Sequence, residues 1–84
     1  MSALPKLPRL PASDLIAALQ RLGFKIVRQK GSHVVLQRQS LNPDGDDINV
    51  TCVVPLHRRD LAVGTLASVL RQAGIDAETL LDVL

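Results

Sequence analysis

The residues best suited to chemistry lie in the stretch Lys30-Gly31-Ser32-His33. Imidazole accepts or donates a proton near neutral pH, and the nearby cations Arg28 and Lys30 favour a phosphate ligand. Glycine permits close approach of another backbone. Cleavage of RNA by attack of a 2′-hydroxyl on the adjacent phosphate needs a proton acceptor, a proton donor and positive charge on the developing dianion. The stretch therefore indicates an acid or base role for His33, and the plainer alternative is an exposed turn histidine.

A second histidine, His57, also stands beside cations, Arg58 and Arg59. It is a candidate for the complementary proton transfer or for a phosphate contact, and a surface-loop histidine is again the alternative. A metal site formed by His33 and His57 with an aspartate would rest on two ligands far apart in the sequence, which is weak evidence. We therefore predict no metal and no cofactor.

Two other residues limit the available chemistry. Phe24 is the only aromatic residue, so bases have no platform for stacking, and RNA would be bound through phosphates, 2′-hydroxyls and shape. Cys52 is the single cysteine, which excludes an internal disulfide. Its place in the alternation of its strand predicts a buried small hydrophobe rather than a nucleophile. The sequence also has no P-loop, no dinucleotide-binding glycine motif and no HExxH motif.

Composition and charge narrow the class of protein. The 84 residues, 46% hydrophobic and 21% charged, suffice for one domain with a thin core. No apolar run approaches the ~20 residues that span a bilayer, and prolines interrupt any signal-peptide core near the N-terminus, so we expect a cytoplasmic protein. Residues 21–38 contain five cations and no acid, whereas acids gather at 44–47 and 76–82. This separation is consistent with a nucleic-acid partner; the alternative is that the cations only solubilise the domain.

The order of elements follows from periodicity and punctuation. Alternating prolines predict an extended flexible arm at residues 1–12, followed by a single domain at 13–84. Ser13 predicts the N-cap of a helix that ends at Gly23. Alternation predicts strands over 24–29, 33–38 and 48–54, the first of them half-buried, with turns at 30–32 and 42–47. Thr65 predicts the cap of a second helix that ends at Gly74, and Asp76 the start of a short third one.

These elements predict an α+β fold of order α-β-β-β-α with a short C-terminal helix. A three-stranded antiparallel sheet with two helices on one face buries the apolar stripe of each element. A site would then lie on the outer face of the sheet or at the ends of its strands.

With these residues assembled, the chain resembles the HicA family, toxins of bacterial and archaeal toxin–antitoxin pairs. The resemblance covers residues 13 to about 84 and rests on landmarks that occur in one order. They are Leu19 with Gly23-Phe24, then Val27 to His33, Val54 to His57, Gly64-Thr65-Leu66 and Leu70 to Gly74. The ordered set is specific, whereas no single landmark would be.

The resemblance implies a fold like the double-stranded RNA-binding domain and an endoribonuclease that cleaves mRNA independently of the ribosome. It also implies a HicB-like antitoxin that covers the active site. The family's Gly-Ser-His motif falls on this chain's Gly31, Ser32 and His33, which implies that His33 is catalytic and that His57 has a second role. The residues expected to contact RNA are Arg28, Lys30, Gly31, Ser32, Arg58 and Arg59.

The chain departs from the family pattern at two places. Many members have a second histidine directly after the first, where this chain has Val34. The connection over residues 42–47 also looks longer than in the shortest members. Two other functions stay open on the sequence: a noncatalytic RNA-binding module in which His33 is only a donor, and an interaction domain that docks a protein on its sheet edge or C-terminal leucines.

Overall fold

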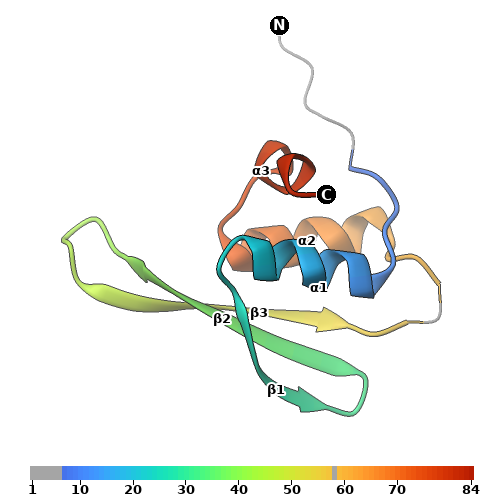
Figure 1. The fold of residues 1–84 in the computed structure, drawn as a ribbon, viewed down its shortest axis with the longest axis horizontal. Helices are drawn as coiled ribbons and strands as arrows, with labels where there is room; N and C mark the ends of the chain where they lie inside the picture. Colours follow the sequence, from blue (N-terminus) through green and yellow to red (C-terminus); the bar gives the residue numbers. More distant parts are fainter. Residues whose placement is uncertain (1–6, 58) are drawn as a thin grey trace, which may run out of the picture.

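The computed structural model describes residues 7–57 and 59–84, and its elements follow the predicted order (Figure 1). The strands form one antiparallel sheet in the order β1-β2-β3, with β2 at its centre. The elements are α1 (Ala12–Arg21), β1 (Lys25–Lys30), β2 (His33–Leu41), β3 (Asp47–Pro55), α2 (Val63–Ala73) and α3 (Ala77–Asp82). The predicted fold class, an α+β fold like the double-stranded RNA-binding domain, is therefore confirmed.

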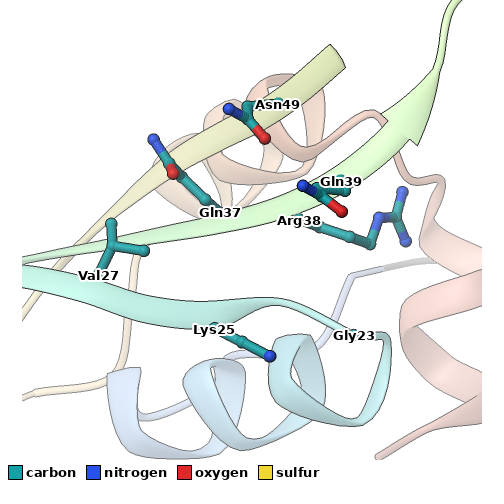
Figure 2. Close-up of a pocket in the computed structure, with 7 residues that line it drawn as sticks. All are labelled: Gly23, Lys25, Val27, Gln37, Arg38, Gln39 and Asn49. Carbon is teal, nitrogen blue, oxygen red and sulfur yellow. The ribbon is translucent and has the colours of Figure 1, made fainter. Parts of the chain in front are cut away.

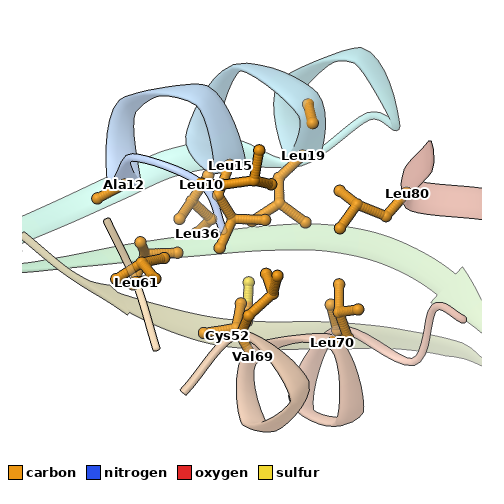
Figure 3. Packing of buried hydrophobic residues seen from close by; sticks show 14 of the residues in the cluster. Leu10, Ala12, Leu15, Leu19, Leu36, Cys52, Leu61, Val69, Leu70 and Leu80 are labelled. Carbon is orange, nitrogen blue, oxygen red and sulfur yellow. The ribbon is translucent and has the colours of Figure 1, made fainter. Parts of the chain in front are cut away.

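The core lies between the sheet and the two longer helices. Figure 3 shows apolar side chains of α1 and α2 pointing into one space together with those of the strands. The sheet contributes buried residues from β2 and β3 only, and α3 adds the fully buried Leu80. The largest fully buried side chains are Phe24, Leu15, Leu19, Leu36, Leu61, Leu66 and Leu80. One thin apolar layer therefore holds all three helices to the sheet.

The described end of the predicted arm is attached to this core. Leu10 is buried, forms an isolated bridge with Leu61 and accepts a hydrogen bond from the Leu61 N–H at 2.7 Å. Residues 1–6 lie outside the described residues. Ser13 is not the N-cap of α1: the cap is Pro11, whose extended ψ of 148° lets its carbonyl accept from the N–H groups of Asp14 and Leu15.

Strand β1 differs from the prediction of a half-buried strand. All six of its residues are exposed, and Ile26 and Val27 are 48% and 51% exposed. A bulge at Val27 breaks the alternation, since Ile26 pairs with Leu36 whereas Arg28 pairs with Val35. The apolar layer above β2 and β3 does not extend over β1, which is an edge strand.

Both hairpin turns are built as their residues predict. The turn between β1 and β2 consists of Gly31 and Ser32, with Gly31 at a φ of 58° that favours glycine. In the turn between β2 and β3, the Asn42 side-chain oxygen accepts from the N–H groups of Asp44 and Asp46 at 3.0 and 2.9 Å. Figure 1 shows this second hairpin extending well beyond the helices.

The predicted ends of α2 and α3 are confirmed in part. Gly74 ends α2 in the left-handed conformation, and Asp76 caps α3 by accepting from the Thr79 N–H at 2.8 Å. Hydrogen bonds from the Thr79 side chain and backbone lower the pKa of Asp76. However, α2 begins at Val63 with Ala62 as its N-cap, so Thr65 is not a cap. None of the described helices is long and apolar enough to cross a membrane.

Candidate active site

His33 is the first residue of the central strand, and it pairs with Lys30 of β1 on one side and Pro55 of β3 on the other. Its neighbour Val34 belongs to the core, so the alternation of the strand places His33 on the opposite, outer face of the sheet. The imidazole is exposed. The short turn and the central position of β2 thus present His33 at one end of the sheet, as the sequence predicts for a strand-end site.

Beside His33 lies an open groove of about 410 Å³ between the end of the sheet and α2. We call it the His33 groove. It is lined by His33, Val53, Pro55, Gly64, Thr65, Ser68, Val69 and Gln72. The helix therefore brings two hydroxyl groups and an amide to the same surface as the imidazole. Gly64 and Thr65 belong to the first turn of α2, where backbone N–H groups have no partner within the helix.

Gln72 fixes the helix to the edge of the sheet. Its side-chain oxygen accepts from the backbone N–H of Val53 at 3.1 Å, and its amide nitrogen donates to the Ser68 hydroxyl at 3.4 Å. Both halves of the amide are thus engaged. This arrangement satisfies an edge N–H of β3 and holds α2 against the strand that pairs with His33.

The helical wall of the groove was not predicted from the sequence. Thr65, Ser68 and Gln72 are spaced by three and four residues, which places them on one face of a helix. This polar stripe runs beside the apolar stripe of Leu66, Val69, Leu70 and Ala73. The polar stripe can be recognised from this spacing in the sequence. That it lines a groove beside His33 depends on how α2 packs against the sheet.

The cations of the acid-free segment divide into two groups. Arg38 lies over the Phe24 ring at 4.7 Å and donates to the Leu22 carbonyl oxygen at 3.2 Å, and Arg21 donates to the Val83 carbonyl oxygen at 2.7 Å. Arg21 and Arg38 therefore stabilise tertiary contacts within the domain. The other three, Lys25, Arg28 and Lys30, are exposed on β1 and pair with Gln37, Val35 and His33.

Those pairings place the three β1 cations along one edge of the outer face. Residues directly opposite in an antiparallel pair share a face, and Gln37, Val35 and His33 alternate along β2 with the core residues Leu36 and Val34. The bulge at Val27 restores Arg28 to this face. The edge therefore carries positive charge up to Lys30, directly beside His33.

The family model for the HicA toxin of bacterial toxin–antitoxin systems matches residues 12–75. The chain belongs to this family. A comparison with curated proteins found no match. The matched range includes the Gly-Ser-His motif, the whole sheet and α2, and it ends before α3. Both walls of the His33 groove thus lie in the HicA part of the chain.

The second histidine of this HicA toxin lies at the same end of the sheet but outside the groove. Leu56 donates its N–H to the carbonyl oxygen of Ser32, which joins the segment after β3 to the turn before His33. His57 follows Leu56 and is exposed, as is Arg59. Neither residue lines the His33 groove. Arg58, also predicted to contact RNA, lies outside the described residues.

Three other residues have structural roles in this HicA domain. Val34, where many members have a second histidine, is 3% exposed and packs in the core. Phe24 is also buried, so it offers no stacking surface. Cys52 is buried, and its burial raises the pKa of the thiol to about 11, so it is not a nucleophile at neutral pH. Within residues 7–57 and 59–84, no three His, Cys, Asp or Glu side chains are grouped to hold a metal ion.

Proposed function

We propose that this HicA toxin is an endoribonuclease that cleaves mRNA in the His33 groove. The observation that carries the proposal is the position of His33, which is exposed, pairs with the cation Lys30 and lines an open groove together with the hydroxyl-bearing residues of α2. Family membership supports the toxin role.

The proposed reaction needs few groups. His33 takes the proton of a ribose 2′-hydroxyl while its oxygen attacks the adjacent phosphorus, and the bond from phosphorus to the 5′-oxygen breaks. The leaving 5′-oxygen receives a proton, which His33 can return. Lys30 and Arg28 stabilise the charge that develops on the phosphate, and the first turn of α2 adds the positive end of its dipole. Gly31 and Ser32 bring the backbone of the turn close to the RNA.

The test is cleavage of a labelled mRNA in EDTA by identically purified wild type, His33→Ala and His57→Ala. Positioned acid or base catalysis contributes about 10²- to 10⁴-fold, so we expect His33→Ala to lose at least about 100-fold in rate. RNA affinity should remain. His57→Ala should lose less, because His57 does not line the groove. Equal rates for wild type and His33→Ala would contradict the proposal.

A noncatalytic RNA-binding module is the second candidate, favoured by the row of exposed cations on β1. In that case folded, antitoxin-free wild type binds RNA and leaves it intact. The third candidate, a protein-docking domain, predicts weak RNA binding with little dependence on salt.

We also propose that a HicB-like antitoxin is the protein partner and that it covers the His33 groove. A partner that covers the reactive surface would block cleavage, and this groove is open to such a partner. The matching test adds a purified HicB-like antitoxin to the cleavage reaction. Cleavage should stop at one equivalent, and the antitoxin should protect the α2 amides of Gly64 and Thr65 from hydrogen exchange.

A further inference from the structure

A second hollow lies on the sheet, away from the His33 groove, and its polar lining consists largely of side-chain amides. It has a volume of about 580 Å³ and lies where β1 begins beside β2 (Figure 2). Gln37, Arg38 and Gln39 line it from β2, Asn49 from β3, Lys25 and Val27 from β1, and Gly23 from the segment before β1. Figure 2 shows the amides of Gln37 and Asn49 projecting from neighbouring strands. No part of the proposed cleavage reaction uses these groups.

The amides are available to a ligand. Gln37 donates its amide N–H to the Thr51 hydroxyl at 3.2 Å, which orients the side chain and leaves its oxygen free to accept. Among the described residues, neither the Gln39 nor the Asn49 side chain has a hydrogen-bond partner. Gln39 and Asn49 are directly opposite in the β2–β3 ladder, and both are exposed. Each offers one acceptor and two donors at neighbouring positions.

The hollow is aligned with the proposed cleavage site. Every second residue of β2 lies on the outer face of the sheet, and these residues are His33, Val35, Gln37 and Gln39. Gln37 and Gln39 therefore lie roughly 13 and 20 Å from His33 along the strand. The cations Lys25, Arg28 and Lys30 accompany them on β1. A strand of RNA that follows these cations therefore passes from His33 to the amides.

We propose that this hollow is a base-reading subsite for single-stranded RNA and that it selects adenine a short distance from the bond cut at His33. The inference rests on the proposed function and adds the source of its sequence preference. Gln and Asn bind adenine in a bidentate manner through its amino group and ring nitrogen, and single strands expose that edge. With Phe24 buried, hydrogen bonds rather than stacking must supply the discrimination. Lys25 binds the phosphate of the selected nucleotide.

The test measures equilibrium binding of wild type to labelled 2′-O-methyl octamers of adenosine, cytidine or uridine, which lack the proposed nucleophile and stay intact. We expect wild type to bind the adenosine octamer roughly 5- to 150-fold more tightly than the other two. Gln39→Leu and Asn49→Leu should each reduce that ratio while leaving uridine affinity unchanged. Gln20→Leu, a matched change of an exposed amide on α1, should leave all three affinities unchanged.

The outcomes separate this inference from the proposed function. Equal affinities for the three octamers, or a preference that survives both substitutions, would overturn the subsite. If wild type at the same time cleaves mRNA and His33→Ala does not, the proposed function stands without the subsite. If folded, antitoxin-free wild type binds none of the octamers and also leaves mRNA uncleaved, both the subsite and the proposed function are overturned.

Discussion

Gly31 is the residue whose geometry presents His33. Its φ of 58° lies in the left-handed region, and a Cβ at this position would meet nothing within 4 Å. Conformation rather than crowding therefore requires glycine. We expect Gly31→Val to destabilise the protein by about 1–3 kcal/mol, and Gly31→Asn to cost less because asparagine tolerates this region. Urea unfolding of both variants checks this, and equal losses would show that the turn can adopt another conformation.

The buried thiol of Cys52 makes the free energy of unfolding depend on pH in the alkaline range. The folded protein holds the thiol pKa at about 11, above the ordinary value of 9.0, because burial disfavours the thiolate; Arg38 opposes this shift. A raised pKa means that folding favours the protonated form, so its stabilising contribution is complete below about pH 9 and is lost as the pH rises toward 11. We expect the unfolding free energy of wild type to fall over this window more steeply than that of Cys52→Val. Parallel curves would mean that the buried thiolate carries no penalty.

The sequence alone predicted that His33 begins a strand after a glycine turn, that Cys52 is buried and that no aromatic residue is available for stacking. They did not separate the cations, because Arg21 and Arg38 have the same charge as Arg28. Contacts with the Val83 and Leu22 carbonyls and with the Phe24 ring, all of them tertiary, give those two arginines structural roles. A charge count in sequence cannot contain this information.

At the scale of elements, α3 shows that the domain extends beyond the range matched by the HicA family model, which ends at residue 75. Leu80 is fully buried, whereas its neighbour Leu81 is 38% exposed. We expect Leu80→Ala to lower the free energy of unfolding by about 2–5 kcal/mol and Leu81→Ala by less than about 1.5 kcal/mol. Urea unfolding measures both. Equal effects would contradict the packing of α3 against the core.

Element order and type were predictable because each stripe or alternation is a local pattern. The burial of β1 was not, because it depends on how far the helical layer extends over the sheet and on the bulge at Val27. The wall of the His33 groove was missed for a related reason. The polar stripe of α2 is visible in sequence, but the docking of Gln72 on the Val53 N–H decides what it faces.

At the scale of the whole molecule, the outer face carries a row of cations on β1 and an amide-lined hollow, and His33 at one end of this face lines the groove that the sheet forms with α2. Figure 1 shows that the sheet extends well beyond the helices. The principal extents are 42, 38 and 19 Å. A domain this flat exposes a large surface for its size, which suits a small protein that binds an extended strand.

This geometry predicts how RNA binding responds to salt. For a protein that binds single-stranded nucleic acid, a plot of log K for binding against log salt concentration has a slope of about −0.7 for each phosphate that the protein neutralises. If Lys25, Arg28 and Lys30 each contact one phosphate, the slope for wild type is about −2, and removing one contact makes it shallower by about 0.7. Arg28→Gln tests this on the outer face. Arg71→Gln is the matched control, because it changes the net charge equally from an exposed position in the last turn of α2. We expect only Arg28→Gln to make the slope shallower. Equal changes in both variants would show that the net charge of the whole protein, and not the row of cations on β1, determines RNA binding.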